Sequence, residues 1–91
     1  MSTLDETALA AALARLTGWG RAGRAIEKTY RFADFRGALG FVNRVGELAE
    51  QAGHHPDIDI RYNTVTLALT THDAGGLSRK DFDLARAIDR A

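Results

Sequence analysis

The 91-residue sequence has no cysteine, only one proline and no excess of charge of either sign. Without cysteine the chain has no disulfide, no thiolate ligand for a metal and no cysteine nucleophile. Its 12 basic and 12 acidic residues balance, and no run of Lys or Arg is longer than a pair. We therefore expect no nucleic-acid partner, because a surface that binds a polyanion needs clustered positive charge.

Long apolar runs are absent as well. No segment approaches the ~18 consecutive apolar residues that a membrane-spanning helix requires, so we expect no membrane partner. The segment MSTLDETALAAALARL carries acidic residues early and lacks the basic and apolar parts of a secretory leader. A chain of this length suits one small domain, and we expect residues 1–91 to form a single soluble domain in the cytoplasm.

Three helices are predicted from capping residues and apolar spacing. In the first, Thr3 and Glu6 have the separation of a capping box. One face of this helix would carry Leu9, Leu13 and Leu16. The GWG segment that follows is expected to end the helix.

The second helix has the strongest sequence support. Asp34 suits its N-cap, Gly53 suits the position just past its end, and Pro56 prevents it from resuming. His54 and His55 are therefore expected in the loop beyond the helix C-terminus. A broad apolar stripe recurs at spacings of three and four, at Phe35, Ala38, Leu39, Val42, Val45, Leu48, Ala49 and Ala52.

The third helix is predicted to begin at Ser78. Asp81 stands at the third helical position, where it completes a capping box with Ser78. Leu77 and Phe82 flank this cap at the positions of a hydrophobic staple. The cap explains Ser78 without function, and no motif of a serine nucleophile surrounds it.

Alternation of apolar and polar residues predicts strands in two regions. Ile26, Tyr30 and Phe32 alternate with polar residues, although Lys28 interrupts the apolar side. The segment DIDIRYNTVTLAL predicts a hairpin that turns at Asn63 and faces the core on one side. Its core-facing residues are expected to be Ile58, Ile60, Tyr62, Val65, Leu67 and Leu69.

The order of elements is thus helix, possible strand pair, helix, strand pair, helix. Strands linked by hairpins pair antiparallel, and one-sided alternation implies that helices cover a single face of the sheet. We predict an α+β fold.

The three histidines, His54, His55 and His72, are the main candidates for chemistry. A zinc site is disfavoured, because adjacent histidines on extended backbone point in divergent directions and seldom bind one ion. Acid–base catalysis suits imidazoles that titrate near neutral pH, and a helix C-terminus favours the protonated form of His54 and His55. Ordinary surface imidazoles remain an equally simple interpretation.

The other polar candidates have structural explanations of their own. The capping box accounts for Asp81, although its remaining lone pairs could also orient a histidine. Glu50 is most simply a solvated helix residue, Tyr62 a core residue and Trp19 a packed anchor. The segment GWGRAG lacks the following helix of a phosphate-binding loop.

The spacing of these residues resembles the signature of the pterin-4a-carbinolamine dehydratases. Further segments are similar to that family as well: FADF, VNRVGELAE, YNTVTLALTTH and GLSRKDFDLA. The resemblance extends over nearly the whole chain from Leu16 onward. The signature positions are Glu50, His54, His55, Pro56, Tyr62, His72 and Asp81.

The resemblance implies a four-stranded antiparallel sheet with three helices packed on one face, in homodimers or homotetramers. It implies removal of water from a 4a-hydroxytetrahydropterin, without metal or redox cofactor, in recycling that serves aromatic amino-acid hydroxylases. By the same resemblance His54 and His72 transfer protons and His55 binds the substrate. Asp81 and Glu50 support the site, Pro56 stiffens the loop, and Tyr62 supplies an aromatic side chain.

Two positions depart from the family pattern. Ile58 stands where vertebrate members have tryptophan, and Ala74 stands where some members have cysteine. These departures suggest a different wall against the pterin. Related proteins also act without catalysis, as a dimerisation cofactor of a homeodomain transcription factor or in Rubisco assembly. A non-catalytic protein-binding module is therefore the alternative, and the intact histidines favour the enzyme.

Overall fold

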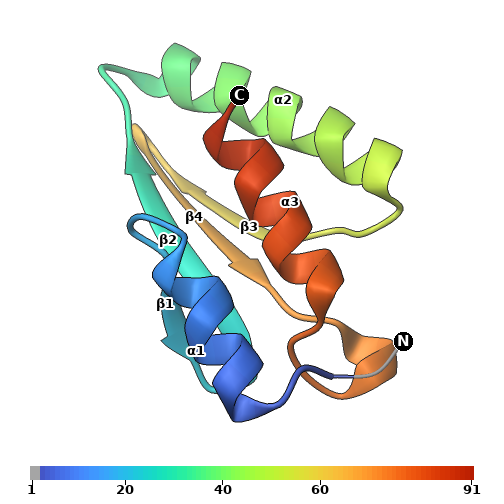
Figure 1. Cartoon of the computed structure of the whole chain (residues 1–91). Coiled ribbons are helices and arrows are strands. Elements are labelled where there is room, and N and C mark those ends of the chain that lie inside the picture. Colours follow the sequence, from blue (N-terminus) through green and yellow to red (C-terminus); the bar gives the residue numbers. More distant parts are fainter. Residues whose placement is uncertain (1–2) are drawn as a thin grey trace.

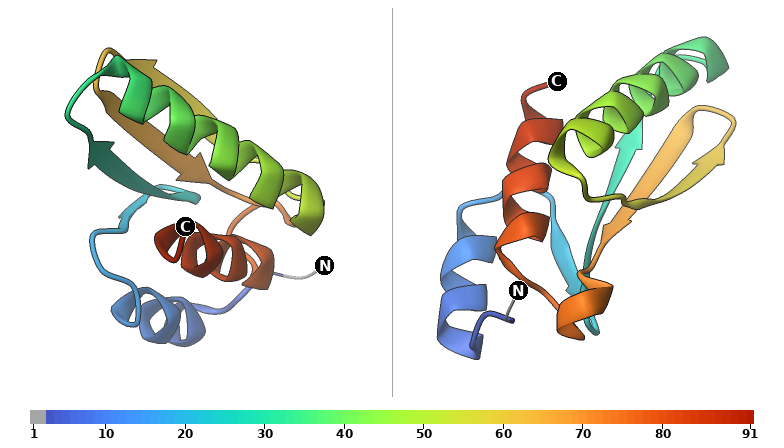
Figure 2. Two further views of the ribbon diagram at one scale, coloured as in Figure 1. Left: turned by 90° about the horizontal axis from the view of Figure 1, so that it is seen from above. Right: turned by 90° about the vertical axis from the view of Figure 1, so that its right-hand side faces the viewer.

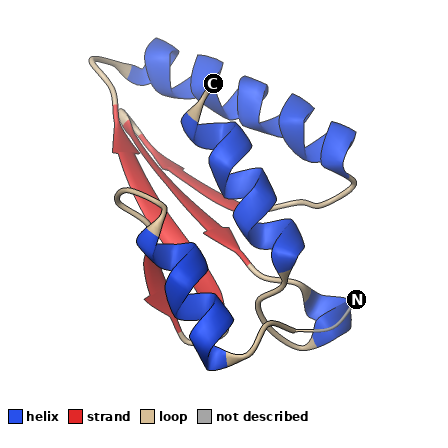
Figure 3. Cartoon of the chain, in the orientation of Figure 1, coloured by secondary structure: helices blue, strands red, loops and turns tan. Residues whose placement is uncertain are grey.

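The computed structural model describes residues 3–91, which form one antiparallel sheet covered by helices (Figures 1 and 3). The strand order is β1-β2-β4-β3, with every neighbouring pair antiparallel. The helices lie on one side of the sheet (Figure 2), which confirms the predicted α+β class. The elements are α1 (Glu6–Ala14), β1 (Gly20–Ala22), β2 (Ala25–Arg31), α2 (Phe35–Ala52), β3 (Asp57–Arg61), β4 (Thr64–Leu69), the short 3₁₀ helix η1 (His72–Ala74) and α3 (Arg79–Asp89).

The core lies between the helices and one face of the sheet. Val65, Leu67 and Leu69 of β4 are fully buried, as their alternation predicted. Their partners across β2 and β3 share this face, while Thr66 and its neighbours face the uncovered side. None of the helices within residues 3–91 is long and apolar enough to cross a membrane.

Helix α2 begins and ends as its sequence predicted. The Asp34 carboxylate accepts a hydrogen bond from the Gly37 amide at 2.8 Å, and Gly53 closes the helix with a left-handed φ of 62°. The apolar stripe is wider than the surface that α3, β3 and β4 cover, however. Phe35 and Leu39, predicted as part of the core-facing stripe, are 46% and 43% exposed.

The C-terminal end of α3 is tied to the rest of the domain through Asp89. The predicted anchor Trp19 is buried, and its indole N–H donates to the Asp89 carboxylate at 3.0 Å. The same carboxylate accepts from the Tyr30 hydroxyl at 2.6 Å and from the Lys28 ammonium at 3.0 Å. This ion pair explains how Lys28 interrupts the apolar side of β2 without disrupting the strand.

Several local predictions are wrong. Ile58 of β3, predicted to face the core, is 40% exposed, and α1 ends at Ala14, before Leu16. Asp5, not Thr3, caps α1, because its carboxylate accepts from the Ala8 amide at 2.8 Å. The Leu4 amide instead bonds the Leu77 carbonyl at 3.1 Å, which draws this part of the chain toward the start of α3.

Tyr62 is not a core residue. Strand β3 ends at Arg61, and Tyr62 takes a φ of 51° in the turn to β4, where it is 67% exposed. The tight turn requires a left-handed residue, and that requirement overrides the apolar alternation of the strand.

Candidate active site

The loop after α2 fixes the position of His54. Gly53 reverses the chain in its left-handed conformation, and the His54 amide then donates to the Ala49 carbonyl at 3.1 Å. The His54 side chain is only 11% exposed and reaches the beginning of α3. The predicted place of this histidine, just past a helix C-terminus, is confirmed.

Asp81, in the first turn of α3, contacts the His54 ring. Its carboxylate is fully buried at the third position of α3, with Oδ1 2.6 Å from His54 Nε2. The other oxygen, Oδ2, accepts from the Ser78 amide at 2.9 Å and from the Thr71 hydroxyl at 2.8 Å. Asp81 therefore caps α3 and holds His54 with different oxygens.

The direction of these hydrogen bonds follows from the number of hydrogens available. The Thr71 hydroxyl donates its single hydrogen to Asp81, so the Ser78 hydroxyl donates to Thr71, at 2.7 Å. Because these two donors occupy Oδ2, the other oxygen, Oδ1, accepts the hydrogen bond from His54 Nε2–H. Nδ1 is then the ring nitrogen of His54 that can exchange a proton with a ligand.

The three histidines meet at one pocket of about 220 Å³. His54 and His55 come from the loop after α2, while His72 begins η1 after the end of β4. His72 is exposed and can exchange protons with solvent. The pocket is lined by Gly53, His54, His55, Thr70, Thr71, His72, Asp73 and Lys80.

Glu50 has a more definite role than the solvated residue predicted from its position. Its carboxylate is in hydrogen-bond contact with His55 Nε2, one turn back along α2, and both side chains are exposed. Glu50 thereby orients His55 at the edge of the pocket. Pro56 follows directly in the loop and leads into β3.

Tyr62 is not brought to this pocket. It lies past the end of β3, in the turn near the start of α2, whereas the histidines lie beyond the end of α2 (Figure 1). Ile58 and Ala74 do not line the pocket either. Within this chain, neither of the two positions that depart from the family pattern forms a wall of the histidine pocket.

Two residues of the site were missed by the sequence interpretation. Thr71 is buried beside Asp81, and its only signal was its place directly before His72. Lys80 precedes Asp81 and lines the pocket, but nothing local distinguishes it from a solvated lysine. Among residues 3–91 no group of three or more His, Asp or Glu side chains is arranged to hold a metal ion.

The arrangement is suited to proton transfer. The His54 side chain is mostly buried and is held by a carboxylate, as the imidazoles of acid–base sites commonly are. His72 offers a second imidazole from a different segment at the same pocket. Lys80 adds a positive charge at the rim, so the pocket combines proton carriers with donors for a polar ligand.

Comparisons with a family model and with individual proteins indicate the same family. The family model described as "Pterin 4 alpha carbinolamine dehydratase" matches residues 2–91. A protein of Thermomicrobium roseum is 54% identical over 97% of this chain and 95% of its own length. One of Chloroflexus aurantiacus is 57% identical, over 98% and 96% respectively. Both are provisionally named pterin-4-alpha-carbinolamine dehydratase.

Solved structures agree with this fold. A crystal structure described as a transcriptional coactivator/pterin dehydratase from Brucella melitensis has a TM-score of 0.93 and 33% identity, covering 98% of this chain and 97% of that one. A pterin dehydratase-like protein described as a RuBisCO assembly factor in the alpha-carboxysome has a TM-score of 0.68 at 21% identity, over 80% and 87%. The second likeness concerns the fold alone.

Proposed function

The chain belongs to the pterin 4 alpha carbinolamine dehydratase family, and we propose that it converts a 4a-hydroxytetrahydropterin to quinonoid dihydropterin and water. The observation that carries the proposal is the pocket where His54, held by Asp81, meets His72. The reaction requires two proton transfers near neutral pH. Imidazole is the side chain whose ordinary titration range suits both transfers.

The two transfers differ in direction. The 4a-hydroxyl must gain a proton to leave as water, and a ring N–H must lose one as the C=N bond forms. His54 Nε2 contacts the Asp81 carboxylate, and the residue directly follows the carbonyl end of α2. We therefore assign His54 Nδ1 to protonation of the leaving hydroxyl. His72, which is exposed, accepts the ring proton and passes it to solvent.

The remaining residues position the substrate in this proposal. His55, oriented by Glu50, binds the pterin at the edge of the pocket. Pro56 limits the motion of the loop that carries both histidines. No metal or redox cofactor is assigned a part, because the reaction is a net loss of water. The product would return to the tetrahydro form by reduction in the cytoplasm, in a cycle with an aromatic amino-acid hydroxylase.

Turnover of a synthetic 4a-carbinolamine tests the proposal. His54→Ala and His72→Ala should each lower kcat by roughly 10²–10⁴-fold, the usual contribution of one acid or base. Asn43→Ala, an exposed change on α2 away from the pocket, serves as the control and should not change the rate. Undiminished turnover in the His54/His72 double variant would overturn the assigned mechanism.

A non-catalytic protein-binding role is the second candidate. Phe35 and Leu39 lie one turn apart on α2 and leave two large apolar side chains exposed, a feature typical of a contact surface. The same surface supports our proposal that the chain forms a homodimer or homotetramer. Light scattering of the unmodified chain and of Leu39→Glu tests assembly. A stable complex with a protein partner, without any carbinolamine turnover, would rank the binding role first.

A further inference from the structure

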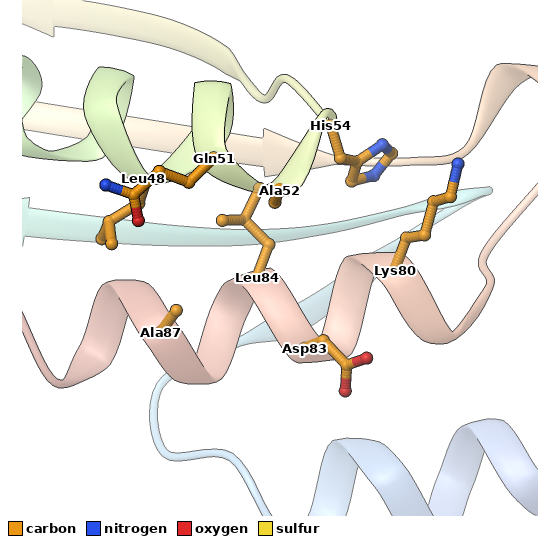
Figure 4. Close-up of a pocket in the computed structure, with 8 residues that line it drawn as sticks. All are labelled: Leu48, Gln51, Ala52, His54, Lys80, Asp83, Leu84 and Ala87. Atoms are coloured by element: carbon orange, nitrogen blue, oxygen red, sulfur yellow. The ribbon is translucent and has the colours of Figure 1, made fainter.

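A hollow of about 220 Å³ lies between α1, the hairpin of β1 and β2, and the start of α3. We call it the α1 hollow. None of its lining residues within 3–91 also lines the histidine pocket or the hollow between α2 and α3 that Figure 4 shows, whereas those two share His54 and Lys80. The α1 hollow is therefore a separate candidate site. It is lined by Glu6, Leu9, Ala10, Leu13, Arg21, Ile26, Leu77 and Phe82.

The inner wall of the α1 hollow is apolar. Its deepest residues are at most 7% exposed: Leu9 of α1, Ile26 of β2, and Leu77 and Phe82 at the start of α3. In another protein, an engineered cavity of about 150 Å³ lined by leucine, isoleucine and phenylalanine stays dry and binds benzene. The α1 hollow has the same residue types and a larger volume, so it has room for a benzene-sized group.

One acid and one base line the hollow on its solvent side. Glu6, in the first turn of α1, and Arg21 of β1 are both exposed. Arg21 Nη1 donates to Glu6 Oε2 at 2.6 Å and Nη2 donates to Oε1 at 3.3 Å. The Arg21 Nε–H donates to the Gly23 carbonyl at 3.1 Å, which ties the guanidinium to the turn between β1 and β2. The guanidinium is thus positioned to hold a carboxylate with two nitrogens.

A ligand can replace the contact between these two side chains. An ion pair between exposed side chains is weak, because water screens both charges. A carboxylate that brings its own apolar group into the hollow can therefore displace the Glu6 carboxylate from Arg21. Glu6 is then free to accept hydrogen bonds from an ammonium group beside the incoming carboxylate.

Helix α1 has other contacts that keep it in place during this exchange. Directly before it, the Leu4 amide donates to the Leu77 carbonyl at 3.1 Å, and Leu9 is buried in the core. The Asp5 carboxylate caps the helix. The Glu6 side chain can therefore turn from Arg21 to a ligand while the backbone that carries it stays fixed.

We propose that the α1 hollow binds a free amino acid with a large apolar side chain. That side chain enters the hollow between Leu9 and Phe82. The α-carboxylate takes the place of Glu6 on Arg21, and the α-ammonium faces Glu6. A zwitterion carries both charges on one carbon and so complements an adjacent acid and base, whereas a simple acid, amine or hydrocarbon would leave at least one of them without a partner.

Calorimetry of the unmodified chain with L-phenylalanine tests the site. We expect saturable binding of L-phenylalanine. Three analogues should each bind more weakly by roughly tenfold or more, because each lacks one part of the ligand: L-alanine the apolar group, phenylethylamine the carboxylate and phenylpropanoate the ammonium. No binding of L-phenylalanine, or equally tight binding of any of the three analogues, would overturn the proposal.

Two matched pairs of variants locate the bound ligand. Arg21→Gln should weaken L-phenylalanine binding by roughly tenfold or more, whereas Arg24→Gln, on the same hairpin but outside the hollow, should not. Ala10→Leu fills part of the hollow and should weaken binding by a similar factor, whereas Ala11→Leu, the next position of α1 and outside the hollow, should not. Equal binding by both members of either pair would reject the assignment to this hollow.

The analogue series needs no substitution, so it decides the proposal even if a variant fails to fold. None of these measurements requires turnover, and failure of the proposed dehydration would leave them unaffected. Titrations at two protein concentrations test the other possible occupant, a second copy of the chain. Binding that weakens at the higher protein concentration would indicate that the second copy fills the hollow, and would overturn the amino-acid site.

Discussion

The substitution Asp81→Asn should leave the fold intact but change which ring nitrogen of a neutral His54 carries the hydrogen. The two donors at Oδ2, the Ser78 amide and the Thr71 hydroxyl, require an acceptor and would take the amide oxygen. The new NH₂ group must then face His54 Nε2, which now lies 2.6 Å from Oδ1 of Asp81. Two donors cannot share that contact, so the ring proton of a neutral His54 moves from Nε2 to Nδ1.

The expected losses of stability and of turnover follow from the same contacts. Asp81→Asn turns three charge-assisted hydrogen bonds into neutral ones, each weaker by about 1 kcal/mol. Relief from burying a charge offsets part of this loss, which leaves a net destabilisation of roughly 1–3 kcal/mol. For a domain of this length that lowers Tm by about 5–20 °C. Turnover should fall much further, by roughly 10²–10⁴-fold, because an amide NH₂ group against Nε2 prevents His54 from carrying a second ring hydrogen, and a neutral imidazole is a far weaker acid than an imidazolium.

Three measurements check this prediction on one variant: thermal unfolding, carbinolamine turnover and nitrogen NMR of the His54 ring. Asp59→Asn provides the matched control, since that carboxylate is exposed and its hydrogen-bond partner within residues 3–91 is the neighbouring Arg61. It should alter neither stability nor turnover. A folded Asp81→Asn protein that keeps the hydrogen on Nε2 and full activity would refute the proposed role of the carboxylate.

Further substitutions test single contacts by urea-induced unfolding. Thr71→Val removes the hydroxyl that donates to the buried carboxylate and should cost about 1–3 kcal/mol, whereas Thr66→Val on the uncovered sheet face should cost less than about 0.5 kcal/mol. Gly53→Ala should cost about 1 kcal/mol through its left-handed φ alone, since no side chain or backbone packed against this position comes within 4 Å of the added methyl group. Burial and the hydrogen bond to Asp89 raise the pKa of Tyr30, so the folded state holds this proton more tightly than the unfolded state. Stability should therefore fall as pH rises above about 10, and Tyr30→Phe should remove that part of the decline.

Local interactions explain which parts of the fold could be predicted. Asp34 and Gly53 mark the ends of α2, and Ser78 marks the start of α3, through contacts within a few residues of the chain. Such contacts form wherever the local sequence permits, so their residue types are visible in the sequence. The alternation of β4 was equally informative because one face of that strand is fully buried.

The errors arose where a distant contact or a turn competed with a local pattern. Thr3 has the spacing of a capping residue, but the bond from Leu4 to Leu77 fixes this segment differently and Asp5 becomes the cap. Tyr62 follows the apolar alternation of β3, but the turn to β4 takes it out of the strand. Helix and strand propensities and the spacing of apolar residues carry no information about the distant Leu4–Leu77 bond or about the turn to β4.

The sequence by itself determined that three histidines and Asp81 stand at the spacing of the dehydratase family, and that His54 follows a helix end. Only the tertiary structure decided which carboxylate oxygen holds His54, that Thr71 completes the network, and that Lys80 lines the histidine pocket. His54 and Asp81 are 27 residues apart. Their contact depends on how α2 and α3 pack over the sheet, a global arrangement that no local stretch of sequence encodes.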